Sequence, residues 1–224
     1  MEKSVYSLVL MDEVVKAIDQ MAHQQNTSRS NLINQILAEE VMLTTPEMRM
    51  RDIFERMIEA MEEVASFQVK LQPSDYCISI RSVMEYKYNP TIRYFIELYR
   101  TNQAAIGQLK VTSRTKSREL QEYLYDFFSY FSKLEQIYMA RYFPNRPTPY
   151  FTIEGEGRFN RELILTEGDG KISNDDMALA MGDYIKMLDQ SLAIYLTHLK
   201  DLEVGRSKIE RNYVEFLNSK PVLL

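Results

Sequence analysis

Four basic side chains occupy positions at which a predicted antiparallel sheet would bring them onto one face. Alternating apolar and polar residues, bounded by turn signals such as Asn89-Pro90, predict strands in a β-meander over 76–114. Because side chains alternate between the two faces, one face would carry Arg81, Arg93, Lys110 and Arg114. These cations could hold a carboxylate or a phosphate. The sequence favours the alternative, a solvated face with cross-strand ion pairs.

Residues that usually carry catalysis or bind metals are few. The two histidines, His23 and His198, lack metal-ligand spacing with each other and with Cys77, the single cysteine. No glycine-rich phosphate loop, nucleophile elbow or paired-cysteine motif is present. Residues 166–176 match only the later part of a calcium loop, because Leu165 stands at the first ligand position. We therefore expect no enzymatic activity, no metal and no cofactor.

The N-terminal stretch 3–42 combines one alternating segment with two short amphipathic patterns. Tyr6, Leu8 and Leu10 would share one strand face, and Val5, Ser7 and Val9 the other. Apolar residues at helical spacing follow from Val14 to Ala22, and Ser28 is a good N-cap for a second helix. A single strand and two short helices cannot bury a core alone. We therefore expect two copies to pair their strands antiparallel across a two-fold axis.

The order of these elements resembles the ribbon-helix-helix superfamily of bacterial DNA-binding proteins, which includes the Arc, MetJ and CopG types. The resemblance rests on Tyr6 to Leu10, on Val14 to Ala22 and on Ser28 to Ile33. It implies that a two-stranded ribbon enters the major groove, with Val5, Ser7 and Val9 facing the bases and Lys3 near the point of entry. It also implies that Ser28, Arg29 and Ser30, at the start of the second helix, contact a phosphate.

The chain is expected to divide at Thr44-Thr45-Pro46, where a threonine cap precedes an early helical proline. The first domain would be the ribbon-helix-helix unit, 1–45, an intertwined dimer. The second, 46–224, would be mainly helical with a small antiparallel β-meander, so that the whole chain is α+β. Its elements would be a helix 46–70, the β-meander 76–114, helices 116–142, 175–199 and 206–218, and a hairpin of 150–154 with 162–165.

Composition limits the class of protein. The 224 residues are 45% hydrophobic and 26% charged, which is ordinary for a soluble globular protein. The formal net charge of −5 excludes a global basic field. One cysteine suits a reducing compartment, and no apolar run approaches the length of a membrane span. We therefore expect a cytoplasmic protein.

These observations predict a sequence-specific DNA-binding transcriptional regulator that forms a homodimer through its N-terminal strand. The C-terminal domain would bind a small ligand or a protein partner. One alternative is a plasmid-maintenance or antitoxin-type DNA-binding protein. The other is a non-DNA interaction protein that uses the ribbon only to dimerise, because acidic residues outnumber basic ones before Thr44.

Overall fold

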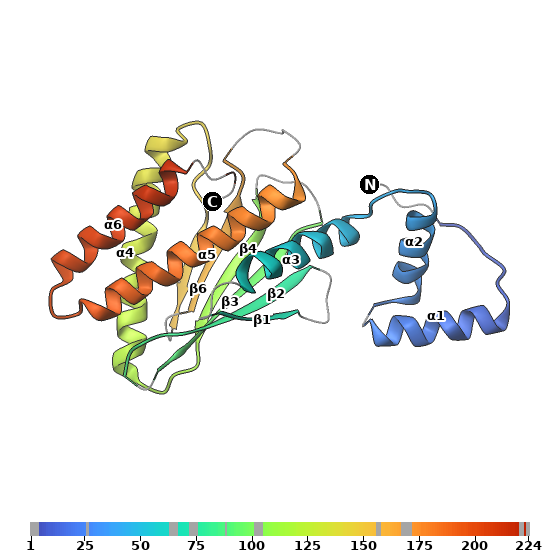
Figure 1. The fold of residues 1–224 in the computed structure, drawn as a ribbon, viewed down its shortest axis with the longest axis horizontal. Coiled ribbons are helices and arrows are strands. Elements are labelled where there is room, and N and C mark those ends of the chain that lie inside the picture. The colour runs from blue at the N-terminus through green and yellow to red at the C-terminus, as the bar shows by residue number, and fades with distance from the viewer. Residues whose placement is uncertain are drawn as a thin grey trace.

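The computed structural model describes residues 5–25, 27–62, 67–71, 76–87, 89–100, 105–155, 158–166, 172–219 and 222. Within them the helices are α1 (Asp12–Gln24), α2 (Arg29–Glu40), α3 (Pro46–Glu62), α4 (Arg118–Tyr142), α5 (Asn174–Thr197) and α6 (Leu202–Asn218). The strands are β1 (Phe67–Leu71), β2 (Cys77–Val83), β3 (Thr91–Leu98), β4 (Ala105–Ser113), β5 (Phe151–Glu154) and β6 (Arg158–Ile164). The larger part of the molecule is a sheet with helices packed on it, and α1 and α2 project from one end (Figure 1).

The strands form one antiparallel sheet in the order β1-β2-β3-β4-β6-β5. Ile80 lies opposite Tyr94, Tyr94 opposite Val111, and Val111 opposite Phe159, so these four side chains share the inward face. All four are buried. The alternation of apolar and polar residues has therefore set the register, because a slip of one residue would turn this apolar row toward solvent.

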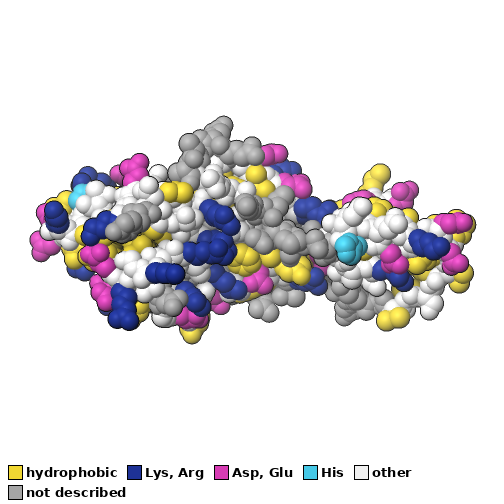
Figure 2. Space-filling view, turned by 90° about the horizontal axis from the view of Figure 1, so that it is seen from below, with side chains coloured by type: hydrophobic (Ala, Val, Ile, Leu, Met, Phe, Trp, Pro, Cys, Tyr) yellow, Lys and Arg dark blue, Asp and Glu magenta, His cyan; other side chains and the backbone are white. Residues whose placement is uncertain are grey.

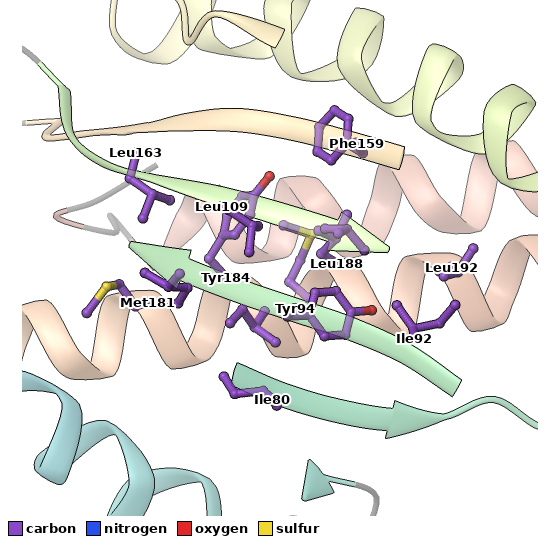
Figure 3. Packing of buried hydrophobic residues seen from close by; sticks show 14 of the residues in the cluster. Ile80, Ile92, Tyr94, Leu109, Phe159, Leu163, Met181, Tyr184, Leu188 and Leu192 are labelled. Atoms are coloured by element: carbon purple, nitrogen blue, oxygen red, sulfur yellow. The ribbon is translucent and has the colours of Figure 1, made fainter. Parts of the chain in front are cut away.

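Two helices, α3 and α5, lie side by side over the inward face of the sheet (Figure 1). Figure 3 shows Met181, Leu188 and Leu192 of α5 against the inward side chains of the strands, including Tyr94 and Leu109. All of them belong to one buried apolar cluster. The helices and the sheet thus form two layers around a single core.

Helix α4 joins the end of the sheet to the other helices through aromatic contacts. Ser117 caps it by accepting a hydrogen bond from the Leu120 N–H. Phe128 stacks on Phe159 of β6 with 4.6 Å between ring centroids, and Phe127 lies 5.5 Å from Tyr195 of α5. Phe127 and Phe128 of the helix predicted over 116–142 therefore lie in the core, as aromatic residues at helical spacing usually do.

The predicted N-terminal strand-helix-helix arrangement is wrong. Residues 5–10 form no strand, and every strand among the described residues follows the first three helices. A strand needs a hydrogen-bonded neighbour. The described strands of the sheet pair only with other strands of that sheet, and residues 5–10 pair with none of them. The two predicted helices are present as α1 and α2, without the ribbon before them.

The sheet is also larger than the predicted meander. A helix was expected over 46–70, but α3 ends at Glu62 and Phe67–Leu71 forms β1. In the sequence, the apolar spacing of α3 continues toward β1. The pattern therefore does not reveal where the helical period ends and the strand period begins. The pairing of β1 with β2 shows that change, since Val69 lies opposite Ile80. The predicted hairpin is present as β5 and β6, and it extends the sheet beyond β4.

The last helix was expected to begin at residue 206, but α6 begins at Leu202 and includes Gly205. Asp201 caps α6 by accepting a hydrogen bond from the Val204 N–H. A Cβ atom on Gly205 would lie 2.9 Å from the Cβ of His198. The glycine therefore serves the close approach of the two helices rather than a helix break.

Candidate functional site

The N-terminal unit, residues 5–43, exposes most of its apolar side chains. Its buried residues in α1 and α2 are Ala22, Leu32, Gln35 and Ala38. Large apolar side chains are exposed on the segment before α1, on both helices and after α2: Val5, Tyr6, Leu8, Val9, Leu10, Met11, Met21, Ile36, Leu37, Val41, Met42 and Leu43. An exposed apolar surface of this extent marks a site of interaction, because a monomer rarely leaves so much apolar surface in water.

The residues predicted to face DNA bases lie in a segment that is neither helix nor strand. Val5, Ser7 and Val9 are all exposed, in the segment that leads into α1. Lys3 lies outside the described residues. The structure therefore leaves the three described side chains accessible without arranging them on a common strand face.

The residues predicted to contact phosphate lie at the start of α2, and all three are exposed. Ser28 is the N-cap and accepts a hydrogen bond from the Asn31 N–H at 3.2 Å. Arg29 donates two hydrogen bonds to Asp19 of α1, Nε to Oδ1 and Nη2 to Oδ2, each 2.6 Å long. These bonds and the attraction of the carboxylate raise the pKa of Arg29 above its usual value. Arg29 thus ties α1 to α2.

The cations predicted to share a sheet face do so. Arg81 of β2 lies opposite Arg93 of β3, and Arg93 lies opposite Thr112 of β4. Arg114 directly follows β4, two residues after Thr112. Lysine and arginine side chains gather near the middle of the larger body on the side seen in Figure 2. The outward face of the sheet, which carries Arg81 and Arg93, is the side away from α3 and α5.

The predicted cross-strand ion pairs form for one of these cations only. Lys110 Nζ lies 3.3 Å from Glu97 Oε2 and 5.7 Å from the centre of the Phe95 ring. Among the described residues, Arg81, Arg93 and Arg114 make no ion pair. Partial burial, together with repulsion by Arg114 and Arg81, lowers the pKa of Arg93. We refer to these three side chains as the arginine cluster.

A half-open groove lies beside the arginine cluster, over β4, β6 and β5. It has a volume of about 770 Å³, and Lys110, Thr112, Arg114 and Asn160 are among the residues that line it. Asn160 lies opposite both Lys110 and Thr152 and donates a hydrogen bond to the Thr152 hydroxyl at 3.1 Å. The volume falls in the range of small-molecule sites, and the lining is rich in hydrogen-bonding groups.

Two buried polar clusters were not predicted from the sequence. In the first, Arg161 of β6 and Glu135 of α4 form an ion pair with fully buried side chains, Nη2 to Oε1 3.1 Å. Tyr184 donates a hydrogen bond to the same carboxylate at 3.0 Å, and the Arg161 guanidinium lies 4.4 Å from the centre of its ring. The signal was present in the alternation of β6, where Arg161 falls on the inward face between Phe159 and Leu163.

The second buried cluster lies between α5 and the sheet. Asp189 accepts hydrogen bonds from the Tyr94 hydroxyl at 2.7 Å and from the Ser82 hydroxyl at 3.0 Å. Burial raises the pKa of Asp189, although these two hydrogen bonds oppose the rise. The Asp189 cluster lies inside the core and away from the groove, so it serves packing and specificity of the fold rather than contact with a ligand. Arg161 of the first cluster also lines the groove.

The described part of the chain contains no group of three or more His, Cys, Asp or Glu side chains that could hold a metal ion. None of its helices combines the length and the apolar character that a membrane span requires. Comparisons with models of protein families, with curated proteins and with solved structures found no match. The function must therefore be inferred from the N-terminal unit and the outward face of the sheet.

Proposed function

We propose that the protein is a sequence-specific DNA-binding transcriptional regulator that acts as a dimer. Residues 5–43 would supply both the contact between subunits and the contact with DNA. The observation that carries the proposal is the N-terminal unit itself, two short helices that project from the larger body and expose an apolar surface (Figure 1). The larger body would bind a small ligand or a protein partner, and the protein would act in the cytoplasm.

A second copy of the chain is the simplest partner for this apolar surface. Helices of 13 and 12 residues with so few buried side chains are marginal by themselves. In a two-fold dimer, the same surface of each subunit covers that of the other, so one exposed face meets its own copy. Burial of the exposed leucine and isoleucine side chains would then stabilise both the dimer and the helices.

The start of α2 supports the assignment of DNA as the ligand. The first backbone N–H groups of a helix, together with its dipole, favour a phosphate. Ser28 and Ser30 add exposed hydroxyl groups at this end of the helix. The resemblance of Ser28 to Ile33 to DNA-binding proteins points the same way, and the exposed Val5, Ser7 and Val9 are the candidates for contact with bases.

Binding to DNA fragments from upstream of the protein's own coding region, measured by gel shift at low salt, tests the proposal. Arg29→Gln should weaken binding and reduce the slope of log affinity against log salt by about 1, because one phosphate contact is lost. Asp19→Asn is the matched variant, since it loosens the same ion pair but leaves the arginine in place. It should bind DNA at least as tightly as the wild type.

Two results would count against DNA binding. One is an absence of any shift with a protein shown to be a dimer. The other is an equal loss of affinity in Arg29→Gln and Asp19→Asn, which would mean that the ion pair matters only for the packing of α1 on α2.

The charge of the N-terminal unit favours a second candidate, an interaction protein that uses this unit only to dimerise. Residues 5–43 contain two Lys or Arg side chains, Lys16 and Arg29, and five acidic ones: Asp12, Glu13, Asp19, Glu39 and Glu40. A net acidic surface repels the DNA backbone. A dimer that binds no DNA in the gel-shift series would support this candidate.

A further inference from the structure

Three arginines lie together on the outward face of the sheet, and no carboxylate in the described part of the chain forms an ion pair with them. Arg81 and Arg93 stand directly opposite each other on neighbouring strands, and Arg114 is close enough to Arg93 to repel it. Like charges directly opposite in a sheet destabilise it. The arrangement therefore costs stability in the protein alone, which is typical of residues kept for binding.

The neighbouring Lys110 shows how an ordinary cation on this face is accommodated. It lies between the ring of Phe95 and the carboxylate of Glu97. Glu97 also accepts a hydrogen bond from Gln108 at 2.7 Å, so its carboxylate is already engaged at the far side of Lys110 from the arginine cluster. A solvated face with cross-strand ion pairs describes Lys110 well, but it does not describe the cluster.

The groove lies next to the cluster, and Arg114 belongs to both. A ligand with its anionic group on the arginines would therefore have room beside it for an uncharged part. Thr112 offers a hydroxyl to such a part, and Asn160 offers its amide oxygen, because its amide nitrogen already donates to Thr152 and Glu154. The guanidinium fork matches phosphate oxygens in a bidentate way, and three forks suit a multiply charged group better than a single carboxylate.

We propose that Arg81, Arg93 and Arg114 bind the phosphate of a small organic phosphate, whose remainder lies in the groove over β4, β6 and β5. The site is on the sheet and not on the N-terminal unit, so the proposal is independent of DNA binding. In a protein that also bound DNA, it would give the larger body a ligand to respond to.

Calorimetric titration of the full chain with tripolyphosphate, at low salt, tests this site. Arg93→Gln and Arg114→Gln should each lower the affinity roughly tenfold to a hundredfold, because each removes a charge-assisted contact. Arg211→Gln, an exposed arginine on α6, is the matched control and should bind as the wild type does. Binding that is absent in the wild type, or equal in all four proteins, would overturn the proposal.

The melting temperature without ligand separates binding from a structural role. Because Arg93 is repelled by its neighbours, Arg93→Gln should melt at the same temperature as the wild type or higher. A lower melting temperature with unchanged tripolyphosphate affinity would show that the arginine only packs on the sheet, and would overturn the proposal.

A short DNA duplex in place of tripolyphosphate distinguishes a small ligand from nucleic acid. If the two arginine variants lose affinity for the duplex while the wild type binds no tripolyphosphate, the cluster contacts a nucleic-acid backbone, and the small-ligand proposal fails. If tripolyphosphate binds through both arginines and does not compete with the duplex, the proposal stands.

Discussion

The core contains more polar and charged side chains than the sequence suggests. Arg161 and Glu135 form an ion pair with fully buried side chains, and Asp189 accepts hydrogen bonds from two hydroxyl groups. The predicted strand began at Glu162, one residue too late to include Arg161. Glu135 lies among the buried aromatic residues of α4, so its own burial was overlooked. Periodicity alone could not pair them, because their contact depends on the packing of α4 against β6.

Asp189 makes the stability of the fold depend on pH. Its pKa is raised in the folded state above the ordinary value of 3.8, so the folded protein keeps the proton at a pH at which the unfolded chain has lost it. Stability from this group therefore falls as the pH rises from about 3.8 through the folded pKa, and stays lowered above it.

Asp189→Asn should remove that fall, since an amide does not ionise but can still accept from Tyr94. The free energy of unfolding in urea, measured over a pH series, should rise for the variant relative to the wild type as the pH passes through this window. Asp183→Asn, an exposed aspartate on the same helix, is the control. A difference that stays constant with pH, or that falls, would refute the account of Asp189.

At the scale of the elements, alternation predicted the middle of the sheet and the sides on which its residues lie. Arg81 and Arg93 share the outward face as predicted, and the apolar Ile80, Tyr94 and Val111 are inward. The edge strand β1 was missed because it is short and follows a helical pattern. The groove could not be predicted, because it needs β5 and β6 beside β4, and the neighbours of a strand in space do not follow from its own pattern.

Gly107 tests the pairing of β3 with β4. Gly107 of β4 lies opposite Leu98 of β3, and a Cβ atom on Gly107 would lie 2.4 Å from the backbone oxygen of Glu97. Gly107→Ala should therefore force the strands apart and cost about 1–3 kcal/mol of unfolding free energy.

Gly182→Ala is the matched control for this prediction. Gly182 lies within α5, and a Cβ atom there would meet only the Met61 side chain, at 3.7 Å. Alanine should stabilise this helix by about 0.5–1 kcal/mol. Chemical denaturation measures both variants, and similar effects of the two substitutions would contradict the strand pairing described above.

At the scale of the whole molecule, the N-terminal unit stands out from the rest of the fold. The sequence predicted α1, α2 and the cap at Ser28, because these depend on local spacing. The strand predicted over residues 5–10 was wrong, because alternation alone supplies no hydrogen-bonded neighbour and the chain's own sheet provides none for this segment. What covers the exposed apolar side chains is therefore the central question about this protein.

Sedimentation equilibrium of the full chain and of two variants answers it most directly. Leu8 and Ile137 are each 60% exposed, the first in the N-terminal unit and the second on α4. We expect the wild type and Ile137→Asp to be dimers and Leu8→Asp to be a monomer, because a charge cannot be buried in an apolar contact without a partner. A monomeric wild type, or a Leu8→Asp variant that remains a dimer, would contradict the account.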